Sequence, residues 1–397
     1  MIKVITTKFG EQLTARRISE FSFKPTWGIS TLRYTTTLSG TGSAAIQEGG
    51  EFKLSSGTAL NSSSTVNTNR RGQYKPGAQC QFGIGVRIPV LPTGSQVIEW
   101  GYTDFQNGFG YGVDATGIYV FIYKNSVREK IYQDDWNGDK LDTTGINRLR
   151  LNLEAGNISQ CDFVWYGYGE IAWSFYIWNP VLKINERKLI HTYRVLESIS
   201  IIDPNQPLLF RIQNGDSSDT NLDLFIGGHQ FSVIDGDINL IERQTTQILE
   251  SFTTAGNTNW QPLIVLRKKA EFPTGRANSV NVFLKRATVA SNTDVRVRIT
   301  IGGVTTGAYS AVTDTPITET AMEQKIASAV TIGVTSSGIP IMYDYAIGNT
   351  SRTASFTRNE FDNPVGGVQE LILWIKRLSS TGTVVINQAS MTVSEEW

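Results

Sequence analysis

A strict alternation of apolar side chains over residues 82–90 constrains the fold of this chain most. The run Phe-Gly-Ile-Gly-Val-Arg-Ile-Pro-Val follows the stretch Arg-Arg-Gly-Gln-Tyr-Lys-Pro-Gly at 70–77. Successive side chains of a strand point to opposite faces, so a period of two predicts a strand with one buried face. In the preceding stretch, Pro76 presets φ, while Gly72 and Gly77 admit the positive φ that other residues resist. The sequence therefore predicts tight turns that lead into a half-buried strand.

Units of the same kind recur along the rest of the chain. Strands are predicted at 96–102, 118–123, 147–153, 161–178, 195–202, 208–213, 222–235, 279–287, 295–301, 371–378 and 383–393. Asn-Gly and similar turn signals separate many of these segments at the spacing typical of a sandwich. A helical pattern is found at 319–329, where Thr320 and Glu323 have capping-box spacing. Only 18% of the residues are charged, which suits exposed strands and turns and favours an all-β fold.

The length of 397 residues is large for a single core, so we expect two domains. We predict a lectin-like jelly-roll β-sandwich over 31–240, a linker over 241–259 and a second, smaller β-sandwich over 260–397. Residues 1–30 are mixed and weakly periodic, and they cannot close a core alone. We expect them to form an arm that docks on another protein through Phe21, Phe23 and Trp27.

The charge balance excludes several classes of partner. Lys plus Arg equals Asp plus Glu at 36 each, so neither nucleic acid nor an anionic membrane is expected as a partner. No apolar run reaches the length of a spanning helix, and residues 1–8 lack the features of a secretory signal. We therefore expect synthesis in a reducing cytoplasm. Cys80 and Cys161 are interpreted as buried free thiols, with a disulfide as the alternative.

The residue types needed for catalysis are sparse. His191 and His229 are the two histidines, and neither has metal-ligand or nucleophile spacing. The chain has no CxxC, HExxH or GxxxxGK motif, so we expect no enzyme activity and no cofactor. A glycosidase would need two acids on one strand face. Asp162 and Glu170 are evenly spaced, but the even spacing over eight residues is weak evidence for such a site.

Calcium is the metal that the sequence favours, if any. Asp135, Asn137 and Asp139 present oxygen atoms at alternate positions. The EF-hand register fails, because placing Gly138 at the loop glycine makes Gln133 the first ligand and no Glu closes the loop. A turn in which these side chains bond their own backbone explains the same residues.

Six motifs occur in a fixed order between residues 70 and 169. They are RRGQYKPG at 70–77, GIGVRIP at 83–89, EWGY at 99–102, NGFGYGVD at 107–114, DWNGDKLD at 135–142 and DFVWYGYG at 162–169. Together they resemble a recurrent module in structural proteins of tailed bacteriophages and some large DNA viruses. The resemblance covers about residues 25–240 and implies a virion component, without indicating its place on head, neck or tail.

We therefore expect a non-enzymatic virion structural protein, made in the host cytoplasm. It would assemble as a homotrimer and dock on capsid, neck or tail proteins. The alternative is a host-recognition protein that binds surface glycans, with Tyr102, Tyr111, Trp165 or Tyr168 stacking on sugar rings. The aromatic stripe over 162–177 is interpreted first as sandwich core and second as such a platform.

Overall fold

The computed structural model describes residues 17–47, 49–144, 149–164, 169–179, 182–194, 201, 203–216, 220–234, 242–254, 259–312, 320–348, 350–355, 364–367, 369–378 and 382–396. This part of the chain is almost entirely β-sheet, and its helices are two single turns, η1 (Pro25–Trp27) and η2 (Gln133–Asp135). The predicted all-β class is confirmed. None of the helices in these ranges has the length and apolarity required to cross a bilayer.

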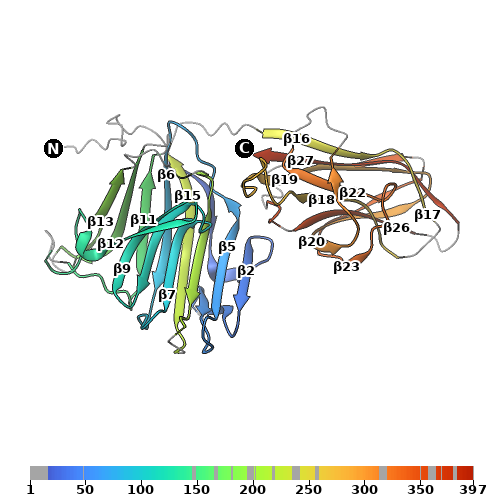
Figure 1. Ribbon diagram of the computed structural model, residues 1–397. Helices are drawn as coiled ribbons and strands as arrows, with labels where there is room; N and C mark the ends of the chain where they lie inside the picture. The colour runs from blue at the N-terminus through green and yellow to red at the C-terminus, as the bar shows by residue number, and fades with distance from the viewer. Residues whose placement is uncertain are drawn as a thin grey trace. The chain divides into compact units, whose positions relative to one another are not determined.

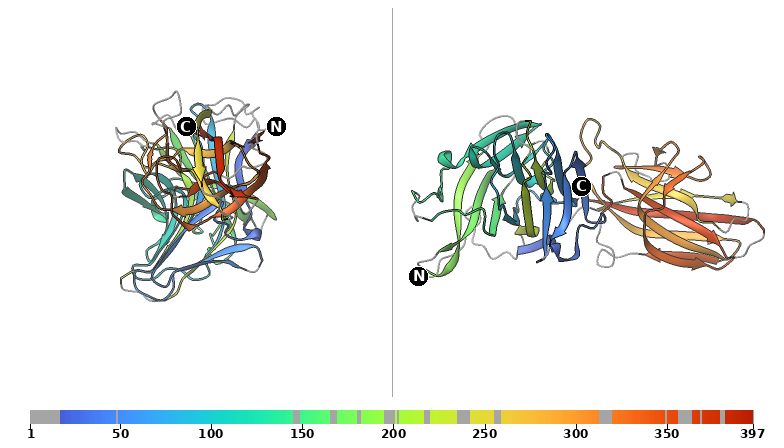
Figure 2. Two further views of the ribbon diagram at one scale, coloured as in Figure 1. Left: turned by 90° about the vertical axis from the view of Figure 1, so that its right-hand side faces the viewer. Right: turned by 90° about the horizontal axis from the view of Figure 1, so that it is seen from below.

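The described residues group into two compact units, each made of facing antiparallel sheets (Figure 1, Figure 2). The first unit holds the described residues up to 234 apart from 31–33. The second holds 31–33 and the described residues from 242 onward. We name the sheets I and II in the first unit and III and IV in the second.

Sheet I contains eight of the described strands. They are β1 (Arg17–Phe23), β3 (Ser43–Gln47), β4 (Glu51–Ser55), β6 (Gln79–Arg87), β11 (Asn157–Phe163), β12 (Glu170–Asn179), β13 (Ile184–Arg194) and β15 (Asp223–Ile234). Their order is β13-β12-β11-β6-β15-β4-β3, and β1 pairs with β15. Residues 82–87 of the alternating run at 82–90 belong to β6, which lies near the middle of this sheet.

Sheet II contains seven of the described strands. They are β2 (Tyr34–Ser39), β5 (Ser63–Arg71), β7 (Val97–Thr103), β8 (Gly108–Asp114), β9 (Gly117–Lys124), β10 (Val127–Tyr132) and β14 (Pro207–Gln213). Their order is β10-β9-β8-β7-β14-β5-β2. One hydrophobic core takes alternate residues from sheets I and II, so the two sheets form a sandwich.

Aromatic side chains join the two sheets by hydrogen bonds as well as by packing. The Trp100 indole of sheet II donates to the Ser159 hydroxyl of sheet I at 2.9 Å. The Trp173 indole of sheet I donates to the Gly110 carbonyl of sheet II at 3.0 Å. Buried indole and phenol groups need such partners, because an unpaired polar atom in the core costs about 1–3 kcal/mol. The core is therefore fixed in register as well as filled.

Glycines on β8 make room for rings from β9 on the outer face of sheet II. A Cβ on Gly112 would lie 2.4 Å from the Tyr119 ring, and a Cβ on Gly110 would lie 2.8 Å from the Phe121 ring. Tyr119, Phe121 and Tyr123 form a separate small cluster there. Gly110 and Gly112 thus let the rings of β9 lie close to the backbone of β8.

The second unit has two sheets around its own core. Sheet III contains β16 (Glu242–Leu249), β17 (Phe252–Thr254), β19 (Asn281–Ser291), β25 (Thr350–Ser355) and β27 (Val384–Glu396). Sheet IV contains β18 (Gln261–Lys268), β20 (Val295–Thr305), β21 (Ser310–Ala311), β22 (Met322–Ile326), β23 (Val334–Ser336), β24 (Ile339–Ala346) and β26 (Glu370–Arg377).

Four local predictions are wrong. The predicted linker at 241–259 contains β16 and β17, which pair with β27. The predicted helix at 319–329 contains β22, because pairing with β18 outweighs the local capping pattern. Residues 149–153 of the predicted strand at 147–153 form a loop. Part of the predicted arm is β1, which belongs to sheet I. The predicted strand at 195–202 lies almost entirely outside the described residues.

Candidate functional site

The three residues predicted to dock on a partner have different environments. Phe21 is 5% exposed and stacks on the Phe231 ring of the core, with ring centres 5.9 Å apart. Phe23 also packs against this core. Trp27, at the end of η1, is 82% exposed. Phe21 is therefore corrected from a docking residue to a core residue, because β1 completes the sandwich, whereas Trp27 presents a large apolar surface to solvent.

The predicted glycan-stacking tyrosines lie inside the sandwich. Tyr102 and Tyr111 are both fully buried. The Tyr102 hydroxyl lies 2.8 Å from the Gly72 and Pro204 carbonyls, and its ring stacks on Phe231 at 5.1 Å. Neither ring can reach a sugar, so their assignment to a glycan platform is wrong. The other two predicted stacking residues, Trp165 and Tyr168, lie outside the described residues.

The calcium candidates are held by protein partners. The Asn137 side chain donates to the Thr192 carbonyl at 2.8 Å and accepts from the Thr192 N–H at 2.8 Å. The Asp139 carboxylate accepts from the Leu141 N–H at 3.1 Å. Asp135 is exposed. Within the described ranges, no group of three or more His, Cys, Asp or Glu side chains could hold a metal ion. The Asp139 contact is the local backbone bond that the turn interpretation predicts, whereas Asn137 bonds the backbone of β13 instead.

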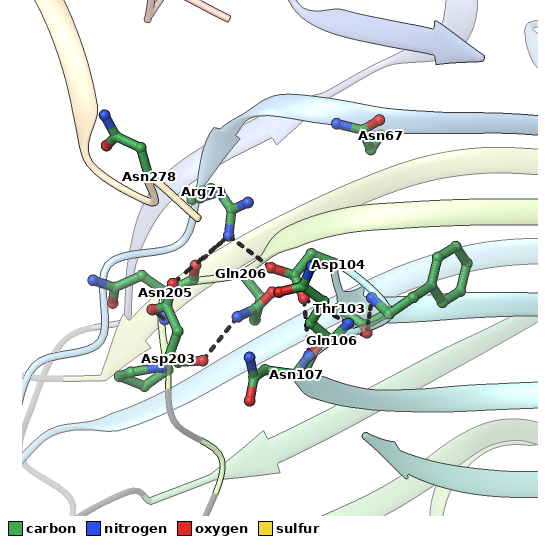
Figure 3. A network of polar contacts seen from close by, with 12 residues as sticks. Asn67, Arg71, Thr103, Asp104, Gln106, Asn107, Asp203, Asn205, Gln206 and Asn278 are labelled. Atoms are coloured by element: carbon green, nitrogen blue, oxygen red, sulfur yellow. Dashed lines mark hydrogen bonds and ion pairs between the residues drawn. The ribbon is translucent and has the colours of Figure 1, made fainter. Parts of the chain in front are cut away.

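The stretch 70–77 is the centre of a polar network that joins three segments of the first unit (Figure 3). One terminal nitrogen of Arg71 donates to the Asn205 carbonyl at 2.9 Å and lies 3.4 Å from an Asp104 oxygen. The same nitrogen is 3.9 Å from Asp203. The Tyr74 N–H donates to the Asn205 side chain at 2.8 Å. Arg71 therefore fastens the end of β5 to the turn after β7 and to the loop before β14.

The two glycines of this stretch have different roles. Gly77 has φ of +92°, so it provides the left-handed turn that the sequence predicted. A Cβ on Gly72 would lie 2.6 Å from the Phe231 ring. Gly72 therefore allows the core ring to approach the backbone, and its role is packing.

Glu99 lies at the centre of an ionic cluster on the outer face of sheet II, which the sequence reasoning missed. Its side chain is fully buried, 2.6 Å from Arg128 and paired as well with Arg211. The Tyr119 hydroxyl donates to it at 3.0 Å. The Arg211 guanidinium also lies 3.9 Å from the centre of the Phe105 ring. Three donors from its own unit therefore occupy the carboxylate, which is buried and does not face a substrate.

The acids considered for glycoside hydrolysis are also engaged elsewhere. Asp162 on β11 accepts from the Gln81 amide at 2.6 Å and pairs with Arg187. Glu170 opens β12, so the two acids belong to different strands. Asp162 is buried and ion-paired, whereas a catalytic pair must face a substrate cleft across the scissile bond. The pair that the sequence suggested is not brought together as a catalytic site.

A pocket of about 800 Å³ opens at one end of the first unit. It is lined by the turn at 113–118 and by the segments 141–143 and 150–154, and it contains Asp114. Burial acts to raise the pKa of Asp114, but hydrogen bonds from Lys130 at 2.6 Å and Tyr132 at 2.9 Å outweigh it and lower the pKa. This acid is therefore a stable carboxylate at neutral pH.

The two histidines are structural. His229 is buried, and its Nε2 lies 2.9 Å from the Tyr34 hydroxyl while Nδ1 lies 3.1 Å from the Gly227 carbonyl. Burial lowers its pKa to about 4. Burial also lowers the pKa of His191, which contacts the Trp173 ring. The cysteines Cys80 and Cys161 are buried free thiols, as the sequence predicted.

Exposed apolar side chains gather where β11, β12 and β13 run side by side in sheet I. Ile158, Trp178 and Leu189 are 52%, 56% and 43% exposed. Ile158 is paired across strands with Tyr176, which lies two residues from Trp178 on the same face. We name Ile158, Tyr176, Trp178 and Leu189 the β12 patch. The strand β13 beside it ends the order of sheet I among the described strands, and the segment 137–139 covers part of its outer edge, because the Gly138 and Asp139 N–H groups donate to the Ile190 and Leu189 carbonyls at 2.9 Å.

No protein-family model matches the chain, and no curated protein sequence does. Solved structures with some likeness include a protein of unknown function from Shewanella oneidensis MR-1, with 10% identity, 60% of this chain and 93% of that chain covered, and a TM-score of 0.37. Arcelin-5, a lectin-like defence protein from Phaseolus vulgaris, is 13% identical in sequence. The match covers 55% of this chain and 100% of arcelin-5, with a TM-score of 0.34. A Bacillus licheniformis beta-glucanase is 12% identical in sequence. The match covers 53% of this chain and 96% of the glucanase, with a TM-score of 0.36. Likenesses this distant carry no argument about function.

Proposed function

We propose that the chain is a non-enzymatic virion structural protein that works by burying surface against copies of itself and against neighbouring virion proteins. The proposal starts from the resemblance of its ordered motifs to a module of bacteriophage virion proteins. The observation that carries it is the β12 patch on the exposed face of sheet I. Large apolar side chains gathered on one exposed face mark a protein interaction surface.

The polar residues of the same motifs support the proposal in a second way. Arg71, Glu99 and Asp162 are each committed to ion pairs inside the first unit. A catalytic acid must face a substrate. The Glu99 and Asp162 side chains are buried and are occupied by arginine partners instead. The motifs thus stabilise a rigid sandwich, which suits a part that holds its neighbours in place.

Copies of the chain would associate through the β12 patch. We infer a homotrimer, in which each copy covers the patch of the next. A closed ring of this kind leaves no exposed patch and does not grow into a filament. Trp27 would serve a different contact, with a capsid, neck or tail protein, because it lies on η1 and is exposed in the single chain.

Sedimentation velocity of the purified chain tests the self-association. The wild type is expected to sediment as a trimer at micromolar concentration, and Trp178→Lys is expected to sediment as a monomer. Val127→Lys is the matched control, because Val127 is 71% exposed on β10, outside the patch. A monomeric wild type, or a trimer that Trp178→Lys leaves intact, would remove the proposed interface.

Incorporation into particles tests the docking role of Trp27. Trp27→Ser is expected to give a folded trimer that is depleted from purified particles, whereas Val127→Ser is expected to be incorporated normally. A truncation for this purpose must keep β1, since its strand completes sheet I. Full occupancy of Trp27→Ser on the particle would contradict the docking role.

A further inference from the structure

The guanidinium of Arg298 lies between two tryptophan rings on the outer face of sheet IV. Along β20, Arg298 alternates with Val297 and Ile299, which belong to the core, so it points away from the core. Its central carbon is 4.4 Å from the centre of the Trp260 ring and 4.6 Å from that of Trp374. The residue is 8% exposed. The electron-rich faces of the two rings therefore hold a nearly buried cation.

Arg298 has no acidic partner among the residues that the structure describes. Its Nε is buried without a hydrogen-bond partner. Enclosing an arginine without a counter-ion costs free energy, which the two rings offset only in part. A guanidinium carries five N–H donors in a planar fork that matches a carboxylate. The cluster is therefore prepared to bind a small anionic group.

Exposed tyrosines extend this cluster along the edge of the sheet. Tyr343 on β24 pairs across strands with Arg298, is 61% exposed and has its ring centre 6.0 Å from that of Trp260. Tyr345, two residues further on the same face, is 49% exposed and pairs with Arg296. Two strand residues span about 7 Å, so the rings form consecutive steps on one surface. Flat rings with an apolar face and a polar tip suit contact with a ring-shaped, partly polar ligand.

Tyr343, Arg298 and Trp374 form one row of side chains across three neighbouring strands, and the next row carries more positive charge. Arg296 on β20 pairs across strands with Lys376 on β26, and its guanidinium carbon is 5.6 Å from the centre of the Tyr345 ring. Each row therefore combines at least one cation with an exposed tyrosine. Because cations and tyrosine rings recur from one row to the next, we expect a ligand in which negative charges and flat faces also recur.

We propose that the outer face of sheet IV binds a glycan that carries carboxylate groups. One carboxylate would receive the fork of Arg298, the next would lie between Arg296 and Lys376, and the sugar rings would rest on Tyr343 and Tyr345. A single-stranded nucleic acid would also use rings and cations. The balance of 36 basic and 36 acidic residues disfavours it, because binding a phosphate backbone relies on an excess of positive charge.

Calorimetric titration of the full chain with a galacturonic acid tetramer tests the proposal. We expect saturable binding that weakens at least about tenfold when the tetramer is fully methyl-esterified, since the ester keeps the sugar rings and removes the charges. Arg298→Lys, which keeps the charge and loses the fork, and Tyr343→Ala are each expected to weaken binding by a similar factor. Val127→Ala in the first unit, at an exposed residue outside the β12 patch, is the control and is expected to bind like the wild type.

Several outcomes would overturn the proposal. They are the absence of binding to the tetramer, equal binding of the acid and the ester, and tighter binding of a thymidine octanucleotide than of the tetramer. Unchanged binding by Tyr343→Ala would do the same, and this variant is informative even if Arg298→Lys fails to fold, because its side chain is exposed. The test does not depend on self-association through the β12 patch, so it can fail while the proposed function stands.

Discussion

The Arg71 guanidinium donates a hydrogen bond to the Asn205 carbonyl across 134 residues of sequence, at 2.9 Å. This bond joins the motif at 70–77 to the loop before β14, and the contact with Asp104 joins it to the turn after β7. The motif at 70–77 thus links three strands of sheet II through their connecting segments.

Replacing Arg71 tests this link. Arg71→Ala is expected to lower the free energy of unfolding by about 1–3 kcal/mol, because a charged donor is lost and the Asn205 carbonyl and Asp104 lose their partner. Urea denaturation measures the change. Arg194→Ala, an exposed arginine at the end of β13, is the control and is expected to change stability by less than about 0.5 kcal/mol. Equal free energies of unfolding for the two variants would show that the network does not stabilise the fold.

Neutralising Glu99 is expected to destabilise the first unit more strongly. Glu99→Gln keeps the shape but leaves Arg128 and Arg211 facing each other without their anion. We expect a loss of about 2–4 kcal/mol, below the value for fully buried pairs because the arginines are 30% and 20% exposed. Glu51→Gln, in the part-exposed pair with Arg87, is expected to cost less than about 1 kcal/mol. The denaturation midpoints of the two variants provide the comparison.

Removing one hydroxyl tests the link between the sheets. The Tyr111 hydroxyl donates to the Gln160 carbonyl at 2.7 Å and accepts from the Ser174 N–H at 3.1 Å. Tyr111→Phe is expected to lower stability by about 1–3 kcal/mol, because buried backbone groups lose their partner. Tyr176→Phe, on the outer face, is the control and is expected to be near neutral. A stable Tyr111→Phe would mean that packing alone sets the register of the sandwich.

Acid is expected to destabilise the first unit through His229. Burial lowers its pKa in the fold to about 4, whereas the unfolded side chain titrates near 6.5. Between these values the unfolded chain binds a proton that the folded chain does not. The free energy of unfolding therefore falls as pH decreases from 6.5 to 4, by about 3 kcal/mol from this group. His229→Gln is expected to flatten the pH dependence in this window, and an unchanged slope would contradict the assignment.

Periodicity in the sequence carried the prediction of the strands that line the core. Residues 82–87 of the run at 82–90 belong to β6, and Phe82, Ile84 and Val86 are buried in the core. Residues 88–90 lie beyond the end of this strand. The alternation of side chains along a strand could also have placed Tyr102 in the core instead of on a glycan-binding surface. Tyr102 shares its parity with Trp100 on β7, so a core position for Trp100 places Tyr102 in the core as well.

Pairings over long sequence distance could not be predicted. β1 joins β15 about two hundred residues later, which converts the supposed arm into part of a sheet. β22 looks helical by its capping pattern, but Thr320 and Ala321 instead bind Glu395 near the far end of the chain. The ionic partners of Glu99 also come from β10 and β14. Contacts of this kind depend on the whole fold and leave no local pattern.

Quantitative mass spectrometry of purified particles tests the central claim most directly. The proposed function implies a virus that encodes the chain. Its particles would be separated on a density gradient and the copies of the chain counted per particle. The account predicts that the chain remains with the particle in a copy number divisible by three. Its absence from intact particles, with the full amount free in the lysate, would contradict a structural role in the virion.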